Sequence, residues 1–107
     1  MAHRLSPPRG VPRAAWERCT DFERLVYRAT AGIPKGSTRS YQWIAWRIGR
    51  PRAVRAVGNA LGRNPFMPVV PCHRVVRSDG RLGGYAGGPA RKRERLRREG
   101  CRALPSA

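Results

Sequence analysis

The chain has 107 residues, which is enough for one small domain and too few for two cores of ordinary size. Its 23 lysines and arginines against 6 acidic residues give a net charge of +17, which favours a nucleic-acid partner without distinguishing DNA from RNA. No apolar run approaches the ~18 residues of a membrane span, and the N-terminal residues do not resemble a secretory signal. The three scattered cysteines fit neither a disulfide framework nor a structural zinc site. We therefore expect a cytoplasmic protein.

The first 30 residues predict an arm followed by a helix. Residues 1–19 carry three prolines and scattered arginines with little periodicity, so we expect a flexible basic N-terminal arm with order beginning near Trp16. Thr20 then stands three positions before Glu23, which is the spacing of a capping box. Apolar residues follow at i, i+3, i+4 and i+7, and this period predicts an amphipathic helix that ends near residues 32–34.

Two further helices are predicted next. Thr38 or Ser40 can cap a helix that runs to about Ile48, and the Gly-Arg-Pro sequence at 49–51 ends it. The following helix runs over about 52–62. A helix, a short glycine-containing turn and a second helix are the layout of a helix-turn-helix.

The two faces of the 52–62 helix differ in composition. Its predicted buried stripe consists of Ala53, Val54, Val57, Ala60 and Leu61. Its outer side carries Arg52, Arg55, Asn59, Gly62 and Arg63, with Gly58 on the flank. Glycine inside a helix costs ~1 kcal/mol relative to alanine, so we interpret the two glycines as allowing a nucleic-acid backbone to approach. The alternative is a solvated helix face, which is the simpler interpretation of any one arginine.

The C-terminal third predicts a hairpin, a glycine-rich loop and a last helix. Asp79-Gly80 between Val75-Val76 and Leu82 is typical of a β-hairpin turn. The last helix spans about 89–99 and has Leu96 and little else to bury, so we expect it to dock through arginine stems. The chain as a whole therefore predicts a mainly α, winged-helix-like DNA-binding domain with a helix-turn-helix and a small β-hairpin wing. We place this domain at residues 20–101 and a tail at 102–107.

Cys72 and His73 are adjacent inside the apolar run VVPCHRVV at residues 69–76. Adjacent residues cannot easily form a direct catalytic pair, because they point to opposite faces of a strand or lie about 100° apart on a helix. We therefore expect His73 to take the thiol proton through a water molecule. The alternative is a buried and inert cysteine, which is the commoner case for any single cysteine.

Several motifs together resemble one family. They are Ser40-Tyr41, Arg55-Ala56-Val57-Gly58, Asn64-Pro65, Pro71-Cys72-His73-Arg74-Val75-Val76 and Gly84-Tyr85-Ala86-Gly87-Gly88. This set resembles the O6-alkylguanine-DNA alkyltransferases, or methylated-DNA–protein-cysteine methyltransferases, over residues 20–100. The PCHR sequence is highly specific, and the intervals from Tyr41 to Glu99 fit without an insertion or deletion. Ala86 stands where that family often has serine.

The resemblance implies a role for each matching residue. Cys72 would accept the alkyl group from guanine O6, and His73 would be its base through water, with Glu99 behind the histidine. Tyr41 would protonate the departing guanine, and Asn64 would help to order the site. The flipped base would lie against Val75, Tyr85, Ala86, Pro71 and Met67. Arg55 would fill the gap in the duplex, and the surrounding DNA contacts would come from Ser40, Arg52, Ala56, Gly58, Asn59 and Arg63.

The function implied by the resemblance is DNA repair by direct reversal. The protein would flip O6-alkylguanine out of double-stranded DNA and transfer the alkyl group irreversibly to Cys72, once per molecule. It would act as a monomer associated with the nucleoid, and no metal or cofactor would be needed. One alternative is a sensor like the short alkyltransferase-like proteins, which bind the lesion and recruit nucleotide excision repair but typically lack the acceptor cysteine. The other is a winged-helix regulator with an inert Cys72, which leaves the spacing of Tyr41, His73 and Glu99 unexplained.

Overall fold

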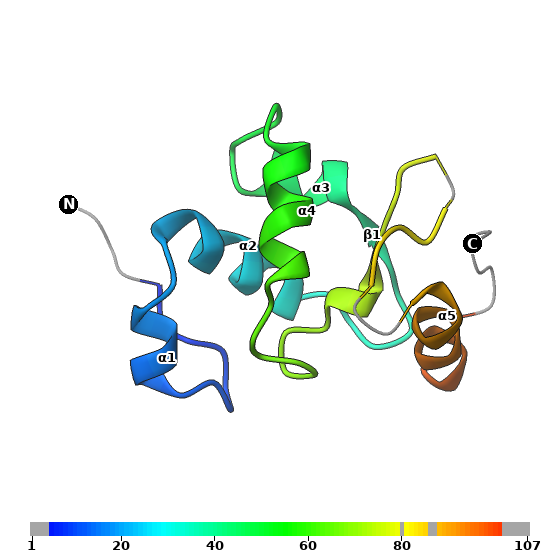
Figure 1. The fold of residues 1–107 in the computed structure, drawn as a ribbon, viewed down its shortest axis with the longest axis horizontal. Helices are drawn as coiled ribbons and strands as arrows, with labels where there is room; N and C mark the ends of the chain where they lie inside the picture. Colours follow the sequence, from blue (N-terminus) through cyan, green and yellow to red (C-terminus); the bar gives the residue numbers. More distant parts are fainter. Residues whose placement is uncertain (1–4, 80, 86–87, 102–107) are drawn as a thin grey trace.

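The computed structural model describes residues 5–79, 81–85 and 88–101. The elements, in chain order, are α1 (Arg13–Glu17), α2 (Asp21–Ala31), β1 (Arg39–Ser40), α3 (Tyr41–Arg47), α4 (Val54–Gly62), η1 (Cys72–Arg74), β2 (Val75–Val76) and α5 (Pro89–Arg98). Figure 1 shows α4 near the middle of the molecule, with α1 toward one end and α5 toward the other. The predicted mainly helical fold with one small sheet is confirmed. Within the described ranges, no helix has the length and apolar character needed to cross a bilayer.

The helix α2 begins with the predicted capping box. The Thr20 hydroxyl accepts a hydrogen bond from the Glu23 N–H at 3.0 Å, and the Glu23 carboxylate accepts one from the Thr20 N–H at 2.9 Å. Two backbone donors at the start of the helix are thereby satisfied. The helix ends at Ala31, within one residue of the predicted end.

The predicted helix-turn-helix corresponds to α3 and α4. Ser40, one of the two caps left open by the sequence, caps α3 by accepting a hydrogen bond from the Trp43 N–H at 2.9 Å. The helix α4 begins at Val54, two residues later than predicted, because the Ala53 N–H closes a turn onto the Arg50 carbonyl at 2.9 Å. Arg52 therefore lies in the turn before the helix.

The segment before α2 differs from the predicted flexible arm. Val11 and Trp16 are only 7% and 2% exposed, and the Trp16 indole donates a hydrogen bond to the Leu5 carbonyl at 2.8 Å. The folded unit thus extends back at least to Leu5. The prediction was wrong for this segment because Val11 and Trp16 are isolated apolar residues among prolines and arginines. Their spacing does not produce the hydrophobic period of a helix. Residues 1–4 of the predicted arm and the predicted tail at 102–107 lie outside the described residues.

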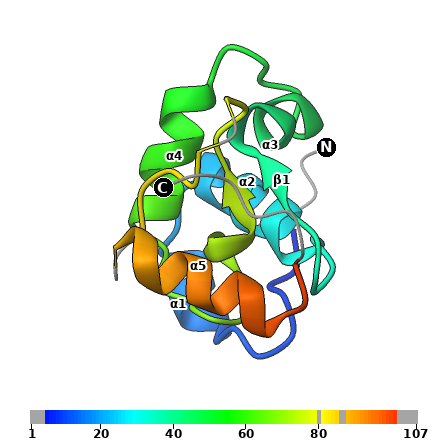
Figure 2. The same cartoon turned by 90° about the vertical axis from the view of Figure 1, so that its right-hand side faces the viewer.

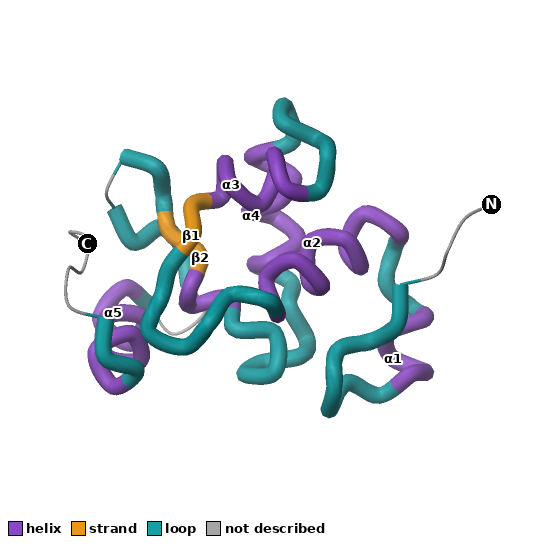
Figure 3. The backbone as a smooth tube through the Cα atoms, turned by 180° about the vertical axis from the view of Figure 1, so that it is seen from behind, coloured by secondary structure: helices purple, strands orange, loops and turns teal. Residues whose placement is uncertain are grey.

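The small sheet joins β1 and β2 in parallel, with Arg39 opposite Val75 and Ser40 opposite Val76. Figure 3 shows the two strands side by side. Residues 75–76 thus pair with the segment before α3, a parallel partner that the prediction did not include. Parallel pairing brings together segments that are far apart in sequence, so local turn chemistry cannot predict it.

The turn expected around Asp79 is nevertheless formed. The Arg77 N–H donates a hydrogen bond to the Arg81 carbonyl at 2.9 Å, and the Arg77 guanidinium binds the Asp79 carboxylate at 2.7 Å. Gly80 lies outside the described residues. The sequence therefore predicted the turn and missed the parallel partner of its first strand.

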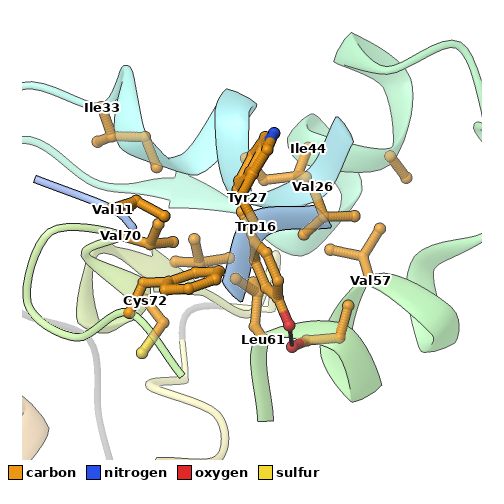
Figure 4. Close-up of a cluster of buried hydrophobic side chains, with 14 residues drawn as sticks. Val11, Trp16, Val26, Tyr27, Ile33, Ile44, Val57, Leu61, Val70 and Cys72 are labelled. Atoms are coloured by element: carbon orange, nitrogen blue, oxygen red, sulfur yellow. Dashed lines mark hydrogen bonds between the residues drawn. The ribbon is translucent and has the colours of Figure 1, made fainter. Parts of the chain in front are cut away.

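One cluster of buried apolar side chains connects α1, α2, α3 and α4 (Figure 4). The Tyr27 hydroxyl of α2 donates a hydrogen bond to the Ala60 carbonyl of α4 at 2.6 Å, and Phe66 packs edge-on against the Tyr27 ring. Of the predicted stripe on α4, Val57, Ala60 and Leu61 are buried, whereas Ala53 and Val54 are partly buried. The Cys72 sulfur lies at the edge of this cluster in Figure 4.

The last helix docks differently from the prediction. Its buried residues are Leu96 and Lys92, both fully inaccessible to solvent, so a lysine rather than the arginine stems provides the second anchor. Leu96 packs with Val76 and Leu82 in a second small cluster. Figure 2 shows α5 beside the η1 turn, which it contacts. This docking places the C-terminal end of the described chain next to Cys72 and its neighbours.

Candidate active site

A cavity of about 490 Å³ has Cys72 in its wall. The other lining residues are Tyr41 from α3, Gly58, Leu61 and Gly62 from α4, Asn64 and Met67 from the following loop, and Arg77, Gly83, Gly84 and Tyr85 from the segment before α5. The structure therefore brings the predicted site residues Cys72, Tyr41, Asn64, Met67, Tyr85 and Gly58 to one cavity. Its volume lies within the ~300–1,000 Å³ of small-molecule sites.

Two of the predicted pocket residues that the structure describes, Pro71 and Val75, are not among those lining the cavity. Pro71 and Val75 are buried beside Cys72, and Val75 belongs to β2, where it pairs with Arg39. Ala86 lies outside the described residues. Pro71 and Val75 thus support the turn that carries the thiol, and their predicted contact with a base stays a prediction.

His73 is buried and its Nε2 lies 2.8 Å from a carboxylate oxygen of Glu99. A carboxylate can only accept, so in the neutral ring the proton is on Nε2 and the lone pair is on Nδ1. Burial lowers the pKa of His73 and outweighs the opposite effect of the Glu99 charge. The ring is therefore neutral near pH 7, with Nδ1 able to accept a proton.

Arg74 fixes the same carboxylate. Its Nε and Nη2 donate to the two Glu99 oxygens at 2.9 and 2.8 Å, and its Nη1 donates to the Ile33 carbonyl at 2.8 Å. Hydrogen bonds from Arg74 are the main cause that lowers the pKa of Glu99 to about 2, with His73 adding to the effect. Glu99 is thus ionised and held by two neighbouring residues of η1.

The Tyr41 side chain approaches the cavity from the start of α3. Burial is the main cause that raises the pKa of Tyr41, with the charge of Cys72 as a smaller cause, so the hydroxyl keeps its proton at neutral pH. Gly83 has a φ of +81°, and a Cβ at this position would lie 3.0 Å from Tyr41 Cε2. The tyrosine ring therefore rests directly on the backbone of the loop.

Asn64 shapes the loop that leads to Cys72. Its Nδ2 donates to the Val70 carbonyl at 2.8 Å, and its Oδ1 accepts from the Phe66 N–H at 2.9 Å. Both ends of the amide are used to hold this loop closed. The prediction that Asn64 orders the site is consistent with these contacts.

The outer side of α4 is open to solvent at Arg55, Ala56 and Asn59, next to the cavity-lining Gly58. The exposed Arg52 lies in the turn before it. The two remaining predicted DNA contacts are engaged within the fold. The Arg63 guanidinium binds the Glu23 carboxylate at 3.1 Å, and the Ser40 hydroxyl caps α3. The predicted contacts of Arg63 and Ser40 with DNA therefore stay predictions. The intramolecular contacts of these two residues do not support them.

Sequence reasoning missed Lys92. Its Nζ donates hydrogen bonds to the Leu82 carbonyl at 2.5 Å, the Gly84 carbonyl at 3.3 Å and the Tyr41 hydroxyl at 3.4 Å. Burial lowers the pKa of Lys92 to about 8. A signal was available, because Lys92 stands four residues before the buried Leu96 and so lies on the same face of α5.

In the sequence, Arg74 stands out only as part of the PCHR motif. Its binding of Glu99 and of the Ile33 carbonyl joins η1 to α5 and to the loop after α2. Its place in the PCHR sequence was the only signal, and it does not reveal these distant partners.

Comparison with known proteins identifies the same family that the sequence motifs resemble. The family described as 6-O-methylguanine DNA methyltransferase, DNA binding domain, matches residues 21–101. A methylated-DNA–protein-cysteine methyltransferase of Mycobacterium tuberculosis is 54% identical over 86 residues, which are 80% of this chain and 52% of that protein. The bifunctional transcriptional activator/DNA repair enzyme Ada of Escherichia coli is 51% identical over 82 residues, which are 77% of this chain and 23% of that protein. The chain thus spans about half the length of the first of these relatives.

Solved structures show the same similarity. Mycobacterium tuberculosis OGT in complex with DNA has a TM-score of 0.75 and 53% identity, covering 81% of this chain and 54% of that chain. Atl1 of S. pombe, in complex with damaged DNA containing O6-carboxymethylguanine, has a TM-score of 0.68 and 35% identity, covering 75% of this chain and 76% of that chain.

Proposed function

Because the chain belongs to the 6-O-methylguanine DNA methyltransferase family, we propose that it repairs DNA by transferring an alkyl group from guanine O6 to Cys72. The observation that carries this proposal is the position of the Cys72 thiol. It lines a cavity together with the Tyr41 side chain, and the adjacent His73 is neutral and hydrogen-bonded to Glu99. The proposed nucleophile and the proposed acid thus line one cavity, and the proposed base is the residue next to the nucleophile in the chain.

The transfer is an in-line displacement at carbon. His73 Nδ1 takes the thiol proton through a water molecule, and the thiolate attacks the alkyl carbon. The S–C bond forms as the C–O6 bond breaks, and the electron pair of that bond stays on the guanine. Tyr41 gives its proton to the departing base. The product is a thioether, which offers no easy route back to a free thiol, so each molecule acts once.

Access to the cavity requires the nucleotide to leave the duplex. A guanine within the stack cannot reach a buried sulfur, and flipping costs a few kcal/mol. The exposed side of α4 offers Arg55 to fill the gap, and Gly58 and Gly62 leave room for the DNA backbone. The charge of +17 supplies affinity that falls steeply with salt. We expect the protein to act in this way as a monomer associated with the nucleoid.

Intact-protein mass spectrometry after incubation with duplex DNA containing O6-methylguanine tests the proposal. We expect a gain of one methylene, located on the Cys72 peptide, and no gain in Cys72→Ala. The Cys72→Ala variant is expected to keep its selective binding to the lesion. A Cys72→Ala protein that still removes the methyl group would contradict the assignment.

A second candidate function is recognition of the lesion without transfer. The similarity to Atl1 in complex with damaged DNA supports it. It predicts tight, lesion-selective binding with no change in protein mass, and it leaves nucleotide excision repair to remove the lesion. The same experiment therefore separates the two candidates, and the presence of Cys72 favours transfer.

A further inference from the structure

Lys92 is a buried cation, and its Nζ has three hydrogen-bond partners among the described residues, all of them uncharged oxygen atoms. The residue is fully inaccessible to solvent, and its Nζ donates to the carbonyls of Leu82 and Gly84 and to the Tyr41 hydroxyl. Burying a charge among neutral groups is costly, and a second leucine would dock α5 more simply. The position of the ammonium therefore calls for an explanation beyond packing.

The protonation state of Lys92 decides whether the Tyr41 hydroxyl accepts a hydrogen bond from it or donates one to it. An ammonium has three N–H groups, which match its three acceptors. Tyr41 Oη then accepts from Lys92, and its own proton is free to point elsewhere. A neutral amine has only two N–H groups and one lone pair. Since the carbonyls can only accept, the lone pair would face Tyr41, and the hydroxyl would donate to the lysine.

We propose that Lys92 is a positioning residue for alkyl transfer, whose ammonium directs the Tyr41 proton into the cavity and replaces it as it leaves. The inference rests on the proposed function, because it concerns the proton that Tyr41 gives to the departing guanine. Lys92 itself touches neither the sulfur nor the base in this scheme. It acts through the Tyr41 hydroxyl, at the longest and most easily altered of its three contacts, 3.4 Å.

The proton movements balance. As the C–O6 bond breaks, Tyr41 gives its proton to guanine, and Lys92 gives a proton to Tyr41 Oη. Lys92 is left neutral and regains a proton from solvent. The direction is favourable, because burial lowers the pKa of Lys92 to about 8 and raises that of Tyr41 above its ordinary value. The Cys72 charge also favours the ammonium form, so formation of the thiolate keeps Lys92 protonated.

The competing explanation is that Lys92 only tethers the 82–84 loop. Two substitutions separate the explanations. Lys92→Gln keeps two N–H donors for the carbonyls but has no proton to give, whereas Lys92→Met removes the donors as well. Arg97→Met is the matched control, because it removes one positive charge from the exposed side of the same helix.

The experiment measures single-turnover methyl transfer from duplex O6-methylguanine and, separately, alkylation of the Cys72 peptide by iodoacetamide. Iodide leaves without a proton, so the second reaction reports the thiol and the fold without needing Tyr41. We expect both Lys92 variants to transfer methyl at least about tenfold more slowly than the parent, as for loss of assistance to a general acid. Alkylation by iodoacetamide is expected to slow far less than methyl transfer, because the Lys92 variants lose only the attraction between the ammonium and the thiolate. Every rate of Arg97→Met is expected to stay unchanged.

The decisive comparison adds Tyr41→Phe. If Lys92 acts through the hydroxyl, Lys92→Gln slows transfer no further once Tyr41→Phe is present. The inference would be overturned if the two substitutions slowed methyl transfer by the product of their separate effects, or if Lys92→Gln transferred at the parent rate. Either result would leave the proposed function intact. A parent protein that gains no methyl group would overturn both. If Lys92→Met does not fold, Lys92→Gln carries the test.

Discussion

The Glu99 carboxylate lies 2.8 Å from His73 Nε2, although 26 residues separate the two in the chain. The same carboxylate binds Arg74, the residue after His73, through both of its oxygens. The end of α5 and the turn that carries Cys72 are therefore joined at a single side chain. One carboxylate both orients the proposed base and stabilises the fold, so its removal has two separable effects.

The first prediction concerns stability in acid. The pKa of Glu99 is lowered from 4.5 to about 2 in the folded protein, chiefly by Arg74. A carboxyl group with a lowered pKa stabilises the fold fully above its unfolded value near 4.5, and this stabilisation is lost as the pH falls toward 2. Each pKa unit corresponds to about 1.4 kcal/mol, so the contribution is at most about 3.5 kcal/mol. We expect Glu99→Gln to be less stable at pH 7 by up to that amount.

Urea unfolding at a series of pH values checks this prediction. The difference between the parent protein and Glu99→Gln should shrink as the pH is lowered from 4.5 toward 2. Glu94→Gln is the control, because Glu94 forms surface ion pairs with the exposed Arg97 and Arg98, and such pairs contribute about 0–1 kcal/mol. A difference that stays constant with pH would mean that the Glu99 charge does not stabilise the fold.

The second prediction concerns the contact between Gly83 and Tyr41. A Cβ at residue 83 would lie 3.0 Å from Tyr41 Cε2 and 3.1 Å from Oη, and the φ of +81° disfavours any L side chain. We expect Gly83→Ala to lower the free energy of unfolding by about 1–2 kcal/mol. It should also slow methyl transfer more than it weakens DNA binding, because the displaced group is the proposed acid.

Gly84→Ala is the matched control for this substitution. A Cβ at Gly84 would meet no atom of the described residues within 4 Å, although Gly84 lines the same cavity. Its thermal stability should stay close to that of the parent. An unchanged transfer rate in Gly83→Ala would show that Tyr41 is not positioned by this contact.

The third prediction tests why α4 contains a glycine at its cavity-facing side. No atom of the described residues lies within 4 Å of a Cβ built on Gly58, so their packing does not require glycine there. Alanine is about 1 kcal/mol more favourable inside a helix. We therefore expect Gly58→Ala to raise the free energy of unfolding by roughly 0.5–1 kcal/mol while it weakens binding to duplex DNA, measured by fluorescence anisotropy.

The control for Gly58→Ala is Gly32→Ala at the end of α2. Gly32 has an ordinary φ of −82°, and its Cβ would make a normal contact with the Ala29 carbonyl at 3.5 Å. This variant should not lose affinity for DNA. A Gly58→Ala protein with unchanged affinity would mean that no backbone approaches α4 at this position.

Local signals in the sequence predicted the local structure. The capping box of Thr20 and Glu23 depends on residues three apart, and the buried stripe at Val57, Ala60 and Leu61 depends on one helical period. These contacts form within single elements. The errors lie in contacts between distant segments, such as the pairing of Arg39 with Val75.

The site was predictable only in part for the same reason. Glu99 could be assigned to His73 through the family resemblance, because spacing alone does not reveal a partner 26 residues away. Lys92 went unnoticed because a lysine among arginines looks like surface charge, and its burial depends on how α5 docks on the 82–84 loop. Order was expected to begin only near Trp16, because the core residues with which the preceding segment packs are also remote in sequence.

The last prediction concerns Arg55, which is exposed on the outer side of α4. An arginine that fills the gap left by a flipped nucleotide is needed only when the base is outside the stack. Arg55→Ala should therefore weaken binding to duplex DNA containing O6-methylguanine more than binding to the same duplex with guanine. Arg13→Ala on α1 removes the same charge and should lower both affinities equally and only slightly. If Arg55 only contacts a phosphate, both affinities fall together, and the negative slope of log K against log salt becomes less steep by about one. Titration of both duplexes at several salt concentrations distinguishes these outcomes, because a selective loss on the lesion duplex requires Arg55 to act where the base has left.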